Sequence, residues 1–176
     1  MEIRLWSYDD SRPKFQKLRC IAVFKGHNQN ICSVNFAPKR GRHFVSSSQD
    51  KTIKLWSLVG IVNQDEDSKK EPVVVNQAQL TVMAHQKFIN MAKFSPNDKL
   101  IATASQDKTI KIWDAKNLQL LHQLTGHKKN VWDLQFSPKD KHLITVSGDE
   151  TVKVWDLSSH KCLATLQGHQ DQIVKV

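Results

Sequence analysis

The chain has 176 residues, and its 26 lysines and arginines against 17 aspartates and glutamates give a formal net charge of +9. No segment approaches the roughly 18 apolar residues that a membrane-spanning helix needs, and no apolar run of signal-peptide length follows Met1, so we expect no membrane association and an intracellular location. The cysteines Cys20, Cys32 and Cys162 match no metal or disulfide spacing and are expected to be reduced, packed thiols.

The elements expected along the chain are all β-strands, because short apolar runs alternate with turn residues. Residues 1–25 are predicted to end one repeat unit, since Glu2–Trp6 matches the end of a phrase that returns later. The second unit, residues 26–83, has strands expected at Ile31–Phe36, His43–Ser47, Thr52–Trp56 and Val73–Val82. The third unit, residues 84–125, has them at Ile89–Phe94, Leu100–Ala104, Thr109–Trp113 and Leu118–Leu124. The fourth unit, residues 126–167, has them at Val131–Phe136, His142–Val146, Thr151–Trp155 and Lys161–Leu166, and residues 168–176 are predicted to begin another unit.

One connection differs from the others. Residues 58–72 are rich in polar and charged side chains and show no apolar period. They predict a surface loop inserted between the third and fourth strands of the second unit. A tolerated insertion and a regulatory insertion are both compatible with this composition.

The repeats themselves define the fold class. Three near-copies of one phrase occupy Ser48–Trp56, Ser105–Trp113 and Ser147–Trp155, and a histidine precedes each one. His85, His127 and His169 are spaced 42 residues apart, and a period of about 40–45 residues is typical of β-propellers with four-stranded blades. We therefore predict an all-β, partial propeller with about three complete blades and two incomplete ones, expected as a segment of a longer propeller.

The repeated polar residues are expected to form buried hydrogen-bond networks. A buried indole N–H needs an acceptor, which the serine of each phrase can supply, and histidine and aspartate can extend the chain of hydrogen bonds. The three predicted networks are His27, Ser48, Asp50 and Trp56; His85, Ser105, Asp107 and Trp113; and His127, Ser147, Asp149 and Trp155.

A Ser-His-Asp hydrolase is the alternative interpretation of these residues. Such an enzyme needs one site with a strained, exposed nucleophile and an oxyanion hole, whereas here the trio occurs three times with similar spacing. The other histidines lack metal-ligand spacing, and six glycines form no phosphate-binding loop. We therefore predict no catalytic residue, no metal site and no cofactor.

The Gly-His pairs and the Ser-x-Asp-x-Thr-Ile-Lys-Ile-Trp-Asp phrases resemble the WD-repeat family over nearly the whole chain. The departures are Ala84 in place of glycine, and Ser7 and Ser57 in place of the aspartate kept at Asp114 and Asp156. Residues 84–107 and 126–138, with the insertion before them, further resemble WD-repeat subunits of the nucleolar small-subunit processome. This narrower resemblance implies a scaffold that assembles a pre-ribosomal particle around ribosomal RNA and a box C/D small nucleolar RNA, in the nucleolus. The alternative is a WD-repeat substrate receptor or signalling adaptor that reads acidic or phosphorylated peptides, with the cytoplasm as its location.

The resemblance also implies where partners bind. In this family the exposed positions surround the channel mouth, and here they include Asn30, Asn90, Asn130, Gln49 and Gln106, with Phe88 and Trp132 as aromatic anchors. An aromatic hot spot contributes on the order of 2 kcal/mol or more, but both rings could instead pack between blades. The expected partners are other proteins of a multi-subunit complex and RNA backbone, with no membrane and no small-molecule substrate.

Basic residues in the turns on the opposite face are the candidate phosphate contacts. The positive net charge favours an anionic partner, although a solvated lysine-rich surface explains it equally well. The candidates are Lys39, Arg40, Arg42, Lys99, Lys139 and Lys141.

Overall fold

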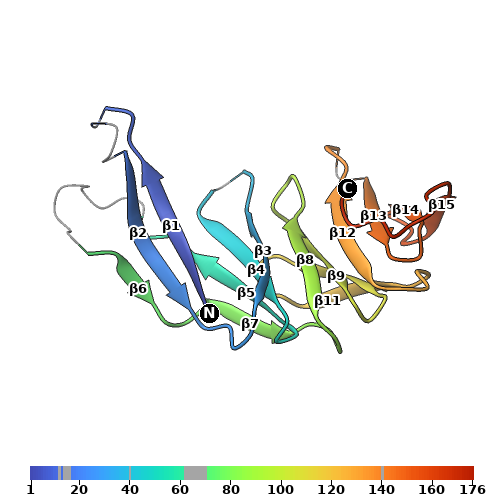
Figure 1. The fold of residues 1–176 in the computed structure, drawn as a ribbon, viewed down its shortest axis with the longest axis horizontal. Coiled ribbons are helices and arrows are strands. Elements are labelled where there is room, and N and C mark those ends of the chain that lie inside the picture. The colour runs from blue at the N-terminus through green and yellow to red at the C-terminus, as the bar shows by residue number, and fades with distance from the viewer. Residues whose placement is uncertain (12, 14–16, 40, 62–70, 140) are drawn as a thin grey trace.

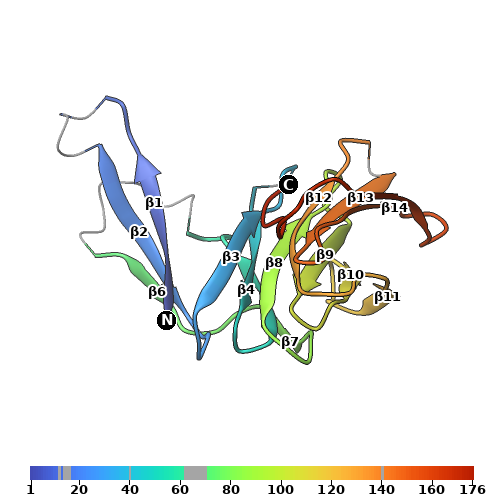
Figure 2. The ribbon, with the colours of Figure 1, turned by 45° about the vertical axis from the view of Figure 1, so that its right-hand side comes forward.

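A computed structural model describes the chain except for residues 12, 14–16, 40, 62–70 and 140. The regular secondary structure of the described part consists of β-strands alone. These strands form four sheets that follow one another along the chain and lie side by side (Figure 1). The all-β propeller class predicted from the repeats is confirmed, and the sheets fan out as consecutive blades (Figure 2). None of the described residues belongs to a helix long and apolar enough to cross a membrane.

The first sheet has the order β1-β2-β6 and consists of β1 (Glu2–Tyr8), β2 (Leu18–Lys25) and β6 (Val73–Val75). The second sheet has the order β3-β4-β5-β7 and consists of β3 (Ile31–Phe36), β4 (His43–Ser48), β5 (Thr52–Ser57) and β7 (Leu80–Met83). The third sheet contains β8 (Ile89–Phe94), β9 (Leu100–Ser105), β10 (Ile110–Asp114) and β11 (Leu120–Leu124). The fourth sheet contains β12 (Val131–Phe136), β13 (His142–Ser147), β14 (Val152–Asp156) and β15 (Cys162–Leu166). The last three sheets are antiparallel throughout, and their strands pair in chain order.

The core lies between neighbouring sheets. Strand side chains alternate between two faces, so in β5 Ile53 and Leu55 are buried while Lys54 between them is only half-buried. The buried cluster between the second and third sheets joins Ile53 and Leu55 to residues such as Ile89 and Trp113. Equivalent clusters lie between the first and second sheets and between the third and fourth. Neighbouring sheets therefore bury the apolar faces that they turn toward each other, as expected for a repeat architecture.

Side chains of the inner strands set the register between neighbouring sheets. Ser33 Oγ accepts the backbone N–H of Ala92 at 2.9 Å, and Asn35 Oδ1 accepts that of Phe94 at 2.9 Å. In the same way Asp133 Oδ2 accepts the backbone N–H of Val176 at 3.1 Å. Residues 168–176 contain no strand, but this last hydrogen bond places Val176 against β12 as Ala92 is placed against β3.

The prediction of one strand over Val73–Val82 is wrong. Val73–Val75 forms β6, which pairs in parallel with β2 of the first sheet, while Leu80–Met83 forms β7 of the second sheet. Residues 76–79, all polar except Ala78, interrupt the strand, and Val73 and Val75 instead pack on a buried cluster that includes Phe24 and Trp56. The inserted connection therefore adds β6 to the first sheet before the chain returns to the second sheet as β7. The greater part of the predicted loop 58–72 lies outside the described residues.

Candidate functional site

A hydrogen-bond network runs from the indole to the carboxylate in each of the last three sheets. In the third sheet Trp113 Nε1 donates to Thr103 Oγ1 at 3.0 Å, and the same hydroxyl lies 2.7 Å from His85 Nε2. His85 Nδ1 in turn lies 2.9 Å from Asp107 Oδ2. Because the carboxylate can only accept, His85 Nδ1 carries the proton, and its Nε2 accepts from the threonine. Every polar group in the chain of contacts is therefore satisfied.

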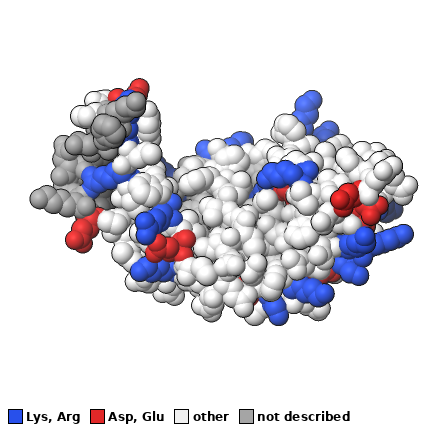
Figure 3. Space-filling model, in the orientation of Figure 1, with Lys and Arg blue, Asp and Glu red and all other residues white. Residues whose placement is uncertain are grey.

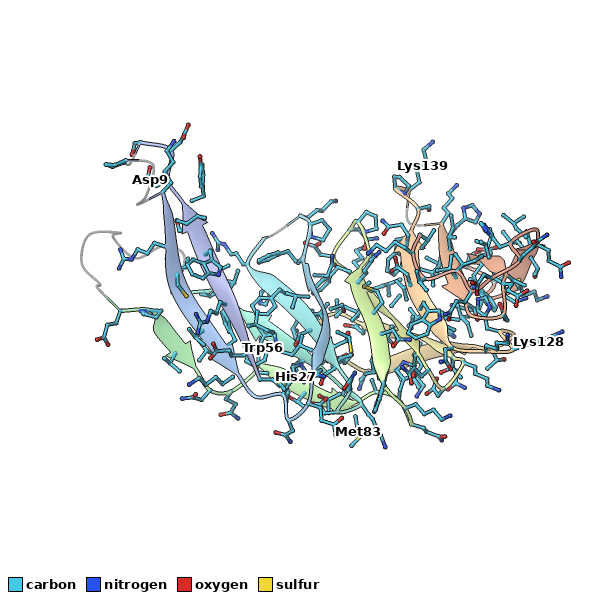
Figure 4. All side chains as sticks on the ribbon, in the orientation of Figure 1. Asp9, His27, Trp56, Met83, Lys128 and Lys139 are labelled. Atoms are coloured by element: carbon cyan, nitrogen blue, oxygen red, sulfur yellow. The ribbon has the colours of Figure 1, made fainter. Side chains whose placement is uncertain are left out.

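The other two networks repeat this geometry. In the second sheet Trp56 Nε1 donates to Ser46 Oγ at 2.8 Å, and His27 joins Ser46 at 2.7 Å and Asp50 at 2.8 Å. In the fourth sheet Trp155 Nε1 donates to Thr145 Oγ1 at 2.9 Å, and His127 lies 2.8 Å from that hydroxyl and 2.9 Å from Asp149. Figure 4 shows His27 at the loop edge of the second sheet, with Trp56 farther into it.

The prediction that Ser48, Ser105 and Ser147 accept the indole proton is wrong. The acceptors are Ser46, Thr103 and Thr145, which lie two residues earlier. Trp113 pairs with Ile101 across the sheet, so the nearest hydroxyl on that face is two residues along the strand, within diagonal reach. Ser105 is four residues along, about 13 Å away at strand spacing, which is too far for the indole.

The serines of the phrase have a different role. Ser105 Oγ donates to the carbonyl of Phe88 at 2.9 Å and accepts the N–H of Asp107 at 3.1 Å. Ser48 makes the same two contacts, with Gln29 and Asp50. They connect the turn that carries the aspartate to the loop that carries the histidine.

A threonine at or just before the start of the third strand completes the network in each of the last three sheets, and the sequence interpretation missed these threonines. Thr109 donates its hydroxyl to Asp107 Oδ1 at 2.6 Å and its backbone N–H at 3.0 Å. Thr52 and Thr151 do the same to Asp50 and Asp149. Their invariance across the three phrases was the available signal.

The network is electrostatically consistent with a neutral histidine and a charged aspartate. Burial would raise the pKa of Asp50, but hydrogen bonds from Thr52, His27 and backbone amides lower it to about 2. Hydrogen bonds of the same kind outweigh burial at Asp107 and Asp149, where the pKa also lies below its ordinary value. Burial lowers the pKa of His85 and outweighs the hydrogen bond and charge of Asp107, which raise it.

These shifts predict an acid-sensitive fold. The pKa values of His27, His85 and His127 all lie below the ordinary value of 6.5. Below about pH 6.5 the unfolded chain therefore binds more protons than the folded one, so stability should fall as pH decreases, by at most about 1.4 kcal/mol per pH unit for each histidine. Urea denaturation between about pH 7.5 and pH 5 measures this slope.

Two variants provide the controls for this prediction. His85→Gln removes one titrating group and should reduce the slope, even though it also lowers stability. His169→Gln changes an exposed histidine outside the networks and is the matched variant with which the slope of His85→Gln is compared. A stability that is flat across this pH range would contradict the assignment of neutral, buried imidazoles.

The buried position of the network hydroxyls argues against the hydrolase alternative. Ser46, Thr103 and Thr145 are all 0% exposed, and each hydroxyl already contacts a histidine and a tryptophan. No substrate can approach them without unfolding the blade. Among the described residues no group of three His, Cys, Asp or Glu side chains gathers where it could hold a metal.

The predicted partner-binding residues differ in exposure. Phe88 is 36% exposed and Asn30 is exposed, whereas Asn90, Asn130 and Trp132 are partly buried. Gln49 and Gln106 are also partly buried. Asn90 Nδ2 donates to the carbonyl of Val131 at 2.7 Å, which links the third sheet to the fourth.

A pocket of about 330 Å³ opens on the loop face of the fourth sheet. Lys128, at its rim, marks its place in Figure 4. The lining residues are Lys108, Lys128, Lys129, Asn130, Trp132, Gly148, Glu150, Asp171 and Gln172. Two of the predicted residues, Asn130 and Trp132, thus come together with three lysines.

The candidate phosphate contacts lie on the turns at the other end of the strands, where Figure 4 places Lys139. Lys39, Arg42, Lys99, Lys139 and Lys141 are all exposed, and Arg40 lies outside the described residues. Acidic groups are interspersed, since the backbone N–H of Lys39 donates to the Asp98 carboxylate. In the face shown in Figure 3, basic side chains form separate groups rather than one continuous surface.

Comparison with known proteins agrees with this architecture. The family model described as WD domain, G-beta repeat, matches residues 18–57, 76–114 and 118–156, more than half of the chain. The chain belongs to the WD-repeat family. The second and third matched stretches each run from the outer strand of one sheet to the third strand of the next, and the first runs from β2 to β5.

Two curated relatives are similar to about two thirds of the chain. Transducin beta-like protein 3 of Mus musculus is 38% identical over 124 residues, which cover 70% of this chain and 15% of the relative. U3 small nucleolar RNA-associated protein 13 of Saccharomyces cerevisiae is 35% identical over 120 residues, 66% of this chain and 14% of the relative. The crystal structure of the RRP9 WD40 repeats superimposes with a TM-score of 0.74 at 25% identity, over 86% of this chain and 42% of that one. The chain thus spans about one seventh of the length of these curated relatives.

Proposed function

We propose that the chain is part of a non-enzymatic WD-repeat scaffold that assembles proteins and RNA in the nucleolar small-subunit processome. The observation that carries this proposal is the similarity to Transducin beta-like protein 3 and to a protein named for its association with U3 small nucleolar RNA. The geometry supports the scaffold role, because the repeated polar residues are buried in the blades and leave the rims free for partners.

The two faces that carry the loops between strands are proposed to bind different partners. The loop face, with Phe88 and the pocket around Trp132, offers aromatic groups among polar ones, which suits a protein partner. The opposite face, with Lys39, Arg42, Lys139 and Lys141, offers exposed cations, which suit RNA phosphates.

Affinity purification of the tagged full-length protein tests the proposal. We expect U3 small nucleolar RNA, pre-ribosomal RNA and processome proteins in the eluate, in excess over an unrelated tagged WD-repeat protein. Replacing Lys39, Arg42, Lys139 and Lys141 with glutamine should reduce RNA that is cross-linked directly to the protein while its protein partners remain. An eluate without pre-ribosomal RNA and processome proteins would refute the proposal. Recovery of acidic or phosphorylated client proteins instead would favour the receptor or adaptor alternative, which the lysines of the loop-face pocket also suit.

A further inference from the structure

A pocket of about 460 Å³ opens between the second and third sheets, at the end opposite the loop face. It lies beside the turns between the first and second strands, the end at which Figure 4 shows Lys139 of the fourth sheet. Its lining residues are Ala37, His43, Leu55, Gln79, Asn97, Asp98, Lys99, Asp114, Ala115 and Lys116. A pocket of this volume accommodates a small organic group.

The pocket lies where the third sheet has alanine in place of leucine. Leu58, Ala115 and Leu157 are equivalent, because each donates its backbone N–H to the residue that precedes the second strand of its sheet. The accepting carbonyls belong to Arg42, Lys99 and Lys141, at 2.8, 3.0 and 3.0 Å. Leu58 and Leu157 pack on the buried clusters between their own sheet and the preceding one. Ala115 packs on the equivalent cluster with a smaller side chain, so it leaves room that leucine occupies at the other two interfaces.

The interior of the pocket combines apolar surface with an open acceptor. Leu55 and Ala37 are buried beneath it. Asp114 Oδ1 accepts the backbone N–H of Lys116 at 2.7 Å, but among the residues that the structure describes nothing donates to Asp114 Oδ2. The equivalent Asp156 has both oxygens occupied, since hydroxyls of the serines that follow it donate to Oδ1 at 2.6 Å and to Oδ2 at 3.1 Å. Asp114 is therefore the carboxylate of this pair that is open to a ligand.

The charges at the rim have the opposite sign. Lys99 and Lys116 line the pocket and are exposed. The other carboxylate, that of Asp98, accepts the backbone N–H of Lys39 at 3.1 Å. An arginine side chain would satisfy Asp114 but would bring a further cation to the two lysines. A nucleotide satisfies both signs of charge, because its base carries N–H donors and its phosphates are negative.

The hydrogen-bonding edge of guanine suits a single carboxylate best. Guanine presents N1–H and an N2 amino proton side by side, and the two oxygens of a carboxylate accept both. Adenine and cytosine each place a ring-nitrogen acceptor next to their amino group, and that acceptor would face the carboxylate. Unpaired RNA bases are commonly recognised by their Watson–Crick edge while they stack on aromatic side chains, histidine included.

We propose that this pocket binds one unpaired guanine base of RNA. The Asp114 carboxylate accepts N1–H and the N2 amino proton, the base rests on Leu55 and on the ring of His43, and Lys99 and Lys116 contact the adjoining phosphates. The choice of RNA as the ligand rests on the proposed function, in which this face contacts RNA.

Saturation-transfer difference NMR on the intact protein tests this proposal, because it detects weak ligands through their own H8 signals. The probes are GMP, IMP, which lacks the N2 amino group, and AMP, which has an acceptor in place of N1–H. We expect GMP to bind about tenfold more tightly than IMP, and AMP not to bind measurably, since each change removes or opposes a hydrogen bond to a carboxylate. Guanosine lacks the phosphate and should bind more weakly than GMP, with a difference that shrinks as salt is added.

Three variants assign the response to this pocket. Ala115→Leu introduces the residue found at the two equivalent positions, so it should fold normally and abolish GMP binding. Asp114→Asn keeps only one acceptor oxygen and should remove the preference for GMP over IMP. Asp156→Asn makes the same change one blade away and should leave binding and preference unaltered. Thermal unfolding of each variant verifies that it is folded.

Equal binding of the three nucleotides would overturn the inference, and so would GMP binding that survives Ala115→Leu. N-acetylarginine amide serves as the protein-side probe, and its binding in place of GMP would assign the pocket to an arginine of a partner protein. These titrations need no processome component, so their failure leaves the purification experiment to decide the scaffold function. An eluate without pre-ribosomal RNA would in turn leave guanine binding by the purified protein as a property of this pocket.

Discussion

Replacing Thr103 with valine is expected to lower the free energy of unfolding by about 2–6 kcal/mol. Valine has nearly the same shape, but it removes the hydroxyl that both Trp113 Nε1 and His85 Nε2 contact. Both groups are buried, so each loses its partner without gaining water, at a cost of about 1–3 kcal/mol for each unsatisfied group. Urea denaturation at neutral pH, monitored by fluorescence, measures the change.

Thr103→Ser is the matched control for this prediction. It keeps the hydroxyl, and serine already occupies the equivalent position at Ser46 in the second sheet. The expected loss is only that of one buried methyl group, about 1 kcal/mol. If valine and serine destabilised the protein equally, the hydroxyl would not be the centre of the network.

Replacing Asp107 with alanine is expected to cost about 3–5 kcal/mol, because several donors around the neutral His85 lose their acceptor, at about 1–3 kcal/mol for each one that stays buried. The carboxylate accepts from His85 Nδ1, from the Gln86 amide and from both donors of Thr109. Removing it leaves these donors without their acceptor at the point where the loop and the turn meet. Thermal and urea denaturation of the variant measure the loss.

Asp114→Ala provides the comparison at a carboxylate outside the histidine networks. Asp114 is partly exposed and accepts the backbone N–H of Lys116 at 2.7 Å, so we expect a loss of about 1 kcal/mol. A double-mutant cycle between Asp107→Ala and His85→Ala should show coupling above about 1 kcal/mol, since the two side chains are in direct contact. Additive effects would mean that the hydrogen bond between His85 and Asp107 contributes nothing to stability.

The spacing of the repeats was sufficient to predict the blades, because a 42-residue period leaves little choice of architecture. The individual residues of the hydrogen-bond networks were harder to predict from the sequence. His85, Asp107 and Trp113 are identical or nearly so in their repeats, and the structure joins them through hydrogen bonds as the residue types suggested. The bridging hydroxyl alternates between serine and threonine, so a search for identical letters selected Ser105 when cross-strand register required Thr103.

Two further features depend on contacts that the repeat pattern does not contain. The valines of β6 could equally well have extended β7, and only the apolar surface near Phe24 and Trp56 decides that they pair with β2. The surroundings of Trp132 depend on Gly148, where an added Cβ would lie 3.3 Å from Trp132 Nε1, whereas the other two phrases have glutamine at that position. Sequence periodicity predicts what the blades share, and the structure was needed for what distinguishes one blade from another.

Hydrogen exchange of the tryptophan indole protons tests the central claim most directly, namely that the repeated histidine, hydroxyl, aspartate and tryptophan groups hold the sheets together. The indole protons of Trp56, Trp113 and Trp155 are donated to buried hydroxyls, whereas Trp6 is 52% exposed. We predict that the first three exchange only as slowly as the whole fold opens, and that Trp6 exchanges as rapidly as a free indole. Rapid exchange at Trp56, Trp113 and Trp155 would contradict the account.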